Sequence, residues 1–162
     1  MSLLIGAHGF SQDDESTIRK GAGLRVGIQS EQLGIHVPIW VGDLATLGPS
    51  IGYSTATDSG TDLLFGLAFR GYLNENQAAP FIGLQYAALI ASPPREDEED
   101  KATIDNVIGL MLGGDYFVSP QFSLGVELQL NYTISDEDSN RFGNRGGETF
   151  NTAGVVSGAF YF

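Results

Sequence analysis

Apolar and polar residues alternate along most of this chain, and the alternation is cleanest in residues 121–135, QFSLGVELQLNYTIS. One face of that segment carries Phe122, Leu124, Val126, Leu128, Leu130, Tyr132 and Ile134, and the other carries Ser123, Gly125, Glu127, Gln129, Asn131 and Thr133. A period of two without a helical period predicts a β-strand with one apolar and one polar face. The alternation alone does not tell which face points inward.

The same period recurs in eight segments, which we predict to be strands: 19–29, 33–41, 45–56, 61–73, 80–91, 103–118, 121–135 and 149–162. The connections at one end include the tight turns VGD and SP. Those at the other end include the long stretches SPPREDEEDKAT and SDEDSNRFGNRGGE, with SEQ as the one short connection there. An even number of strands with short turns on one rim and longer loops on the other is typical of an outer-membrane barrel.

Three further features favour an outward-facing apolar side. The polar faces of the first and third segments are mostly Gly, Ser and Thr, which suit the crowded interior of an eight-stranded barrel and would weaken a soluble sheet. Most segments reach the roughly 9–11 residues that a tilted strand needs to cross a bilayer. Aromatic residues near segment ends, as in interfacial girdles, are Trp40, Tyr53, Tyr72, Phe81, Tyr116, Phe117, Phe122, Tyr132, Phe160 and Tyr161.

We therefore predict an all-β protein, an eight-stranded antiparallel transmembrane up-and-down β-barrel with its apolar side toward lipid. A soluble, lipocalin-like carrier with the apolar side inward is the alternative. The 162 residues suffice for one domain, and the net charge of −12 argues against nucleic acid as a partner. The chain has no Cys, which excludes disulfides and thiolate metal sites, and it has no apolar run of about 18 residues that would form a transmembrane helix.

The first residues differ from the rest of the chain. Residues 1–12, MSLLIGAHGFSQ, place the apolar LLIGA before a small-x-small sequence, Gly9 to Ser11. This pattern is typical of the end of an export signal, and an ordinary N-terminal extension or strand is the alternative. We expect residues 13–162 to form the single barrel domain.

Three stretches resemble the small outer-membrane β-barrel family of Gram-negative bacteria, the relatives of OmpA and OmpX: PFIGLQYAAL, GGDYFVSPQFSLGVELQLNY and the terminal SGAFYF. The resemblance covers residues 19–162, and its most specific part runs from Tyr116 to Glu127. It implies location in the bacterial outer membrane, contact with outer-membrane lipids and lipopolysaccharide, and no shared catalytic residues. It also implies that Val156, Phe160 and Phe162 form an assembly signal for the barrel-insertion machinery. The short first loop and the acidic third loop depart from the family pattern and leave the surface partner open.

The polar face collects charged and amide residues that we expect to form a structural network in the lumen: Arg25, Arg70, Asp115, Glu127, Gln85, Gln129 and His36. Buried charges persist only when they are paired and hydrogen-bonded. We expect Arg25 and Arg70 to pair with Glu127 and Asp115 and to close the lumen. The alternative is a narrow path for ions or small solutes in which these pairs exchange partners, although eight strands leave no continuous water channel.

Enzymatic chemistry has one candidate, His36, as the general base of a lipid-modifying enzyme. Such a base needs a Ser or carboxylate partner, the alternation directs His36 inward, and no GxSxG motif is present. The five carboxylates of REDEEDK, residues 95–101, match no EF-hand spacing. We therefore expect no catalytic residue, metal or cofactor, and a non-catalytic structural role. The loops 92–103 and 135–149 are the expected contact points for a surface partner.

Overall fold

The computed structural model describes residues 21–29, 32–56, 60–92, 102–139 and 144–162. The expected export-signal remnant, residues 1–12, and the acidic stretch 95–101 lie outside them. The described strands are β1 (Gly23–Gln29), β2 (Gln32–His36), β3 (Ile39–Gly42), β4 (Ala45–Ala56), β5 (Gly60–Tyr72), β6 (Ala78–Ser92), β7 (Thr103–Ser119), β8 (Phe122–Ile134) and β9 (Glu148–Tyr161). No helix in the described part of the chain is long and apolar enough to cross a membrane.

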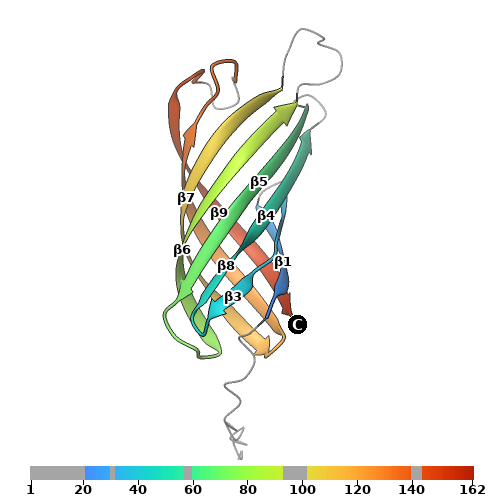
Figure 1. Ribbon diagram of the computed structural model, residues 1–162, viewed down its shortest axis with the longest axis vertical. Coiled ribbons are helices and arrows are strands. Elements are labelled where there is room, and N and C mark those ends of the chain that lie inside the picture. The colour runs from blue at the N-terminus through green and yellow to red at the C-terminus, as the bar shows by residue number, and fades with distance from the viewer. Residues whose placement is uncertain (1–20, 30–31, 57–59, 93–101, 140–143) are drawn as a thin grey trace, which may run out of the picture.

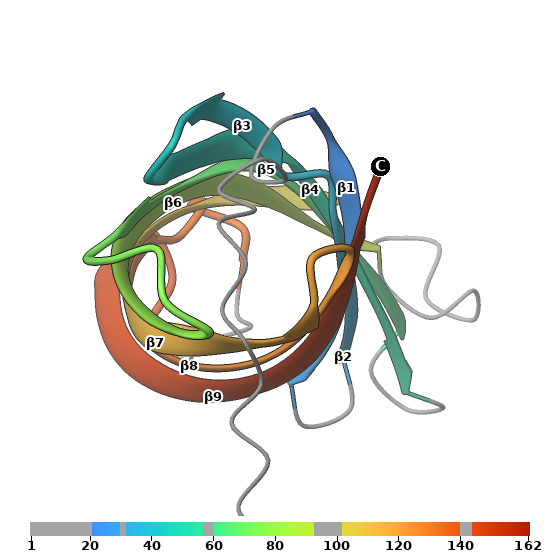
Figure 2. The same ribbon diagram turned by 90° about the horizontal axis from the view of Figure 1, so that it is seen from below.

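The strands form one closed antiparallel sheet. Their order is β2-β1-β9-β8-β7-β6-β5-β4-β3, and a further pairing between β2 and β4 closes the ring that Figure 2 shows end-on. Both β2 and β3 pair with β4, so together they occupy one position in the wall. The predicted closed eight-stranded barrel is confirmed.

The predicted continuous strand 33–41 is wrong in one detail, because Val37 and Pro38 interrupt it. Proline has no amide hydrogen to donate to a ladder. The wall stays joined at the interruption, since the Val37 amide donates to the Pro49 carbonyl at 2.9 Å and the Gly23 amide donates to the Pro38 carbonyl at 2.8 Å. Gly48 lies opposite, where a Cβ atom would overlap the Val37 carbonyl oxygen.

The apolar face of every strand points outward. Leu67, Val126 and Leu128 are 55%, 63% and 57% exposed, whereas Glu127 and Gln129, which alternate with the apolar residues of β8, are buried. Closing the sheet also pairs the backbone polar groups along these ladders, as a lipid environment requires. The predicted orientation is confirmed, and the soluble carrier with its apolar side inward is contradicted.

Half of the aromatic residues expected in girdles lie elsewhere. Trp40, Tyr72, Phe81 and Tyr161 are buried inside the barrel at the end of the short turns, and the half-buried Phe117 packs against them. Ring centroids lie 5.2 Å apart for Trp40 and Tyr72 and 5.6 Å apart for Tyr72 and Phe81. The expectation failed because position near a strand end does not determine the face, which the period of two does.

Candidate functional site

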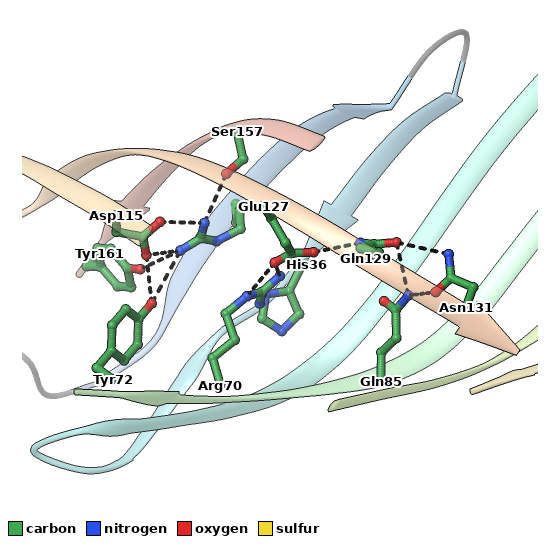
Figure 3. Close-up of polar contacts among 11 residues, drawn as sticks. His36, Arg70, Tyr72, Gln85, Asp115, Glu127, Gln129, Asn131, Ser157 and Tyr161 are labelled. Atoms are coloured by element: carbon green, nitrogen blue, oxygen red, sulfur yellow. Dashed lines mark hydrogen bonds and ion pairs between the residues drawn. The ribbon is translucent and has the colours of Figure 1, made fainter. Parts of the chain in front are cut away.

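The lumen above the aromatic cluster holds a buried ion pair between β1 and β7 (Figure 3). Arg25 binds Asp115 with both terminal nitrogens, and Nη1 lies 2.9 Å from Oδ1. The Tyr72 hydroxyl donates to Asp115 Oδ2 at 2.7 Å, and Arg25 also donates to Ser157 Oγ at 2.9 Å. The fork of Arg25 matches the carboxylate, so each charge is compensated where water is excluded.

A second ion pair joins β5 to β8. Arg70 Nε and Nη2 both donate to Glu127 Oε2, at 3.0 and 2.9 Å, and Gln129 donates to the other carboxylate oxygen at 2.6 Å. The remaining nitrogen, Nη1, lies 3.0 Å from His36 Nδ1. Because a guanidinium only donates, Nδ1 is the acceptor and the proton of neutral His36 is on Nε2.

A layer of amides continues the network toward the long-loop end. The Gln85 amide nitrogen on β6 donates to Gln129 Oε1 at 3.1 Å and to Asn131 Oδ1 at 3.0 Å. The alternation along β8 aims Glu127, Gln129 and Asn131 at the axis, so one strand supplies acceptors to two layers. These contacts need no ligand, and the described residues include no group of three or more His, Asp or Glu placed to hold a metal ion.

A cavity of about 110 Å³ lies beside these layers, toward β1, β2 and β4. Its polar lining includes Arg70, Glu127 and Gln85, and Gln29 and Gln32 line it at the ends of the first hairpin. One water needs roughly 10–15 Å³ measured in this way, so the cavity has room for several waters or for a polar group of similar size. The lumen therefore combines a packed, ion-paired part with a hydratable part.

At the long-loop end, Asp105 of β7 holds the start of the connection between β8 and β9. Its two carboxylate oxygens accept from the Asp136 amide at 2.8 Å and from Ser139 Oγ at 2.9 Å. Asp105, Ser135 and Ser139 are all buried. This part of the connection consequently lies over the β7–β8 side of the lumen.

The structure places all seven residues expected in the lumen on the inner face: Arg25, Arg70, Asp115, Glu127, Gln85, Gln129 and His36. It pairs Arg25 with Asp115 and Arg70 with Glu127, an assignment that the sequence left open. The three residues expected to form an assembly signal, Val156, Phe160 and Phe162, lie exposed on the outer face.

Sequence reasoning missed several partners in this network. Tyr72 and Tyr161 were expected in girdles, yet their hydroxyls reach Arg25, at 3.4 and 3.3 Å. Tyr72 is followed by the apolar Leu73, and Tyr161 is preceded by the apolar Phe160. Because consecutive residues of a strand face opposite sides, this alternation was the signal that places both Tyr residues inside. The same alternation places Asp105, next to the exposed Ile104, inside the barrel, but its role in holding a loop gave no signal, because that role depends on the loop folding back onto it.

Two solved structures have a fold similar to that of this chain. The N-terminal β-barrel domain of Pseudomonas aeruginosa OprF is similar, with a TM-score of 0.66 and 12% sequence identity over 87% of this chain and 95% of that domain. Neisserial surface protein A (NspA) is also similar, with a TM-score of 0.61 and 13% identity over 87% of this chain and 93% of that one. The fold is that of a small outer-membrane β-barrel.

No family model matches this barrel, and no curated protein sequence matches it either. At 12% and 13% identity, the two solved structures establish the shape of the barrel and leave its role to the chemistry of its own residues. In this barrel that chemistry consists of paired charges, amides and an aromatic cluster inside an apolar outer surface.

Proposed function

We propose that this chain is a non-catalytic β-barrel of the bacterial outer membrane, with a lumen closed by its own side chains and a structural, surface-related role. The observation that carries the proposal is the apolar outer surface around a lumen whose buried charges are paired. Outer-membrane lipids and lipopolysaccharide would contact that surface. The loops 92–103 and 135–149 would meet any surface partner, and the barrel-insertion machinery would read Val156, Phe160 and Phe162.

Location in a membrane is supported by the physical properties of the outer surface. Large apolar side chains exposed on every strand would be a severe aggregation liability in water. The same side chains are stabilised by acyl chains, and closed barrels satisfy their backbone hydrogen bonds internally. Of the two similar solved structures described above, one is named a β-barrel domain and the other a surface protein.

Closure of the lumen is supported by two successive barriers. The aromatic cluster around Trp40 and Tyr161 fills the short-turn end, with Met111 fully buried beside it. The Arg25–Asp115 and Arg70–Glu127 pairs follow. Removing one partner of a buried pair typically costs about 3–5 kcal/mol, so a charge passing between them would meet a large barrier.

Cell fractionation, heat-modifiability and planar-bilayer recording test this proposal together. We expect the protein in the outer-membrane fraction and a gel band that migrates differently before and after boiling. We also expect no unitary conductance. Recovery from the soluble fraction without detergent would refute the membrane assignment, and steady single-channel events would refute the closed lumen.

A narrow ion or small-solute channel is the second candidate, because both Arg70 and Glu127 of a buried ion pair line the cavity. It predicts unitary conductance that changes when Glu127→Gln or Arg70→Gln removes one charge. Absence of unitary conductance for the wild type and for both variants would refute the channel.

A lipid-modifying enzyme based on His36 has less support. The His36 Nδ1 atom accepts from Arg70, which fits a positioning role for the ring better than activation by a carboxylate. Comparison of lipid A from cells with and without the protein tests this candidate, and a changed lipid A profile would revive it.

A further inference from the structure

The first hairpin is shorter than the strands on either side of it. The ladder between β1 and β9 ends at Ile28–Val156, whereas that between β8 and β9 continues to Ile134–Glu148. The ladder between β2 and β4 ends at Leu33–Tyr53, whereas β4 and β5 remain paired up to Ala56–Gly60. Figure 1 shows β4 and β5 continuing past the end of β1. Among the described residues, one edge of β9 and one edge of β4 therefore flank a notch above this hairpin.

The lower part of the notch lies at the depth of lipid. The unpaired edge of β9 runs from Glu148 to Val155, a stretch of roughly 25 Å at about 3.3 Å per residue. On the outer surface, the rings of Tyr132 and Phe150 lie 4.9 Å apart, an aromatic pair of the kind found at a membrane–water interface. The edge continues from Phe150 toward Val155, into the apolar belt. Unpaired backbone at that depth is tolerated when it lines a cavity that holds water.

The lumen cavity reaches this notch. Gln29 and Gln32 of the hairpin and Val155 of β9 all line it. Its wall is thin here, because Gly34 pairs with Gly27 on one side and with Gly52 on the other. A Cβ atom on Gly34 would meet only the Gly27 carbonyl oxygen, at 3.9 Å, so the space in front of it is open.

The opposite side of the mouth is covered. The carboxylate of Asp105 holds Asp136 and Ser139 over the β7–β8 side, and both Ser135 and Ser139 are buried. Within the described part of the chain, the lowest wall beside the cavity is consequently the first hairpin.

We propose that this hairpin forms a lateral portal through which an amphiphile of the outer leaflet places its polar head in the cavity while its acyl chain leaves over the hairpin. The inference rests on the proposed membrane location. The lining fits such a ligand, because Gln29, Gln32 and Gln85 offer amides to a polar head whereas Leu64 and Val155 offer apolar contact. The charges of Arg70 and Glu127 compensate each other, so the head is uncharged or zwitterionic.

Fluorescence quenching tests the portal, and the absence of Cys from the chain makes single-site labelling clean. Gly34→Cys, Ile35→Cys and Gln85→Cys each receive a bimane label, and the barrels are refolded into phosphatidylcholine vesicles that contain acyl-chain nitroxide lipid. Ile35 points to lipid, Gly34 faces the cavity at the portal, and Gln85 lies on the far wall. We expect quenching of the Gly34→Cys label to approach that of Ile35→Cys and to exceed that of Gln85→Cys severalfold.

A longer hairpin provides the matched control. Inserting about four alternating residues into each of β1 and β2 raises the wall by about 13 Å. Heat-modifiability verifies that this variant folds, and quenching of its Gly34→Cys label is expected to fall to the Gln85→Cys level. Two results would overturn the portal and leave the membrane location intact. One is quenching of the Gly34→Cys label that does not fall in the longer hairpin. The other is an unquenched Gly34→Cys label in barrels whose Ile35→Cys label is quenched. An unquenched Ile35→Cys label would refute the membrane location itself, and the portal with it.

Occupancy of the cavity is tested separately. Gly34→Phe fills the cavity, whereas Gly42→Phe adds the same ring on β3 at the short-turn end, away from the notch, where no atom lies within 4 Å of the new Cβ. Both variants are purified from outer membranes in mild detergent, and co-purifying lipid is measured by mass spectrometry. Loss of lipid in Gly34→Phe with retention in Gly42→Phe is expected. Equal lipid in the two variants would overturn binding in the cavity.

Discussion

Arg25 and Asp115 lie 90 positions apart in the chain, yet both are buried and bound through two parallel hydrogen bonds. Because both residues are buried, removing one of them is expected to affect stability differently from replacing both. Loss of one partner leaves an uncompensated charge, whereas replacement of both leaves a neutral, packed interior. The double variant is therefore expected to be much less destabilised than the single variant.

At this scale we predict that Asp115→Ala lowers the free energy of unfolding by about 3–5 kcal/mol, because the Arg25 charge stays buried without a partner. The double variant Arg25→Met with Asp115→Leu is expected to recover most of that loss. Urea unfolding in lipid vesicles measures both, with the chain's single Trp, the buried Trp40, as the fluorescent reporter. Additive losses in the double variant would contradict a compensated pair.

At the scale of the element, the interrupted strand formed by β2 and β3 depends on the residue opposite it. Pro38 is buried, and Gly48 leaves room for the displaced Val37 carbonyl. We predict that Gly48→Ala destabilises the barrel by about 3 kcal/mol, because the added methyl has to displace backbone. The matched Gly34→Ala, with open space before it, is expected to be neutral or to stabilise by about 0.5–1 kcal/mol. Urea midpoints of the two variants provide the comparison, and equal midpoints would contradict it.

The C-terminal residue Phe162 is expected to combine a structural role with the proposed assembly role. Phe162 exchanges backbone hydrogen bonds with Ala22, at 2.9 and 3.3 Å, while its side chain is 75% exposed. We predict that Phe162→Ala, which keeps those backbone bonds, leaves refolding into vesicles nearly unchanged and lowers the amount of folded barrel in cells. Heat-modifiability in vitro and in outer-membrane fractions measures the two outcomes. An equal loss in both settings would argue for packing rather than recognition by the insertion machinery.

For the whole molecule, the apolar outer surface makes stability depend on depth in the membrane. Leu128 lies mid-strand on the outer face of β8, and Ile134 lies at the end of the same face. We predict that Leu128→Arg costs about 2–4 kcal/mol in a bilayer, whereas Ile134→Arg costs about 0–1 kcal/mol. Reversible unfolding from vesicles measures the difference. Equal costs at the two positions would be inconsistent with a spanning barrel.

The sequence determined the fold and its orientation almost completely. A period of two assigns each residue of a strand to one face, as β8 illustrates from Phe122 to Ile134. Turn lengths then order the strands. Hence the strand positions, the outward apolar face and the residues that enter the lumen were all readable in the chain. The Val37–Pro38 interruption was readable in principle as well, because proline lacks the amide hydrogen.

Only the tertiary structure decided what happens across the lumen. Which Arg meets which carboxylate depends on sheet register and on side-chain reach, and these bring together residues 57 to 90 positions apart in the two ion pairs. The same holds for the aromatic cluster at the short-turn end and for the notch above the first hairpin, which exists because β9 and β4 extend beyond β1 and β2. Local periodicity fixes the face of each residue, whereas closure of the sheet fixes the height at which residues on different strands meet.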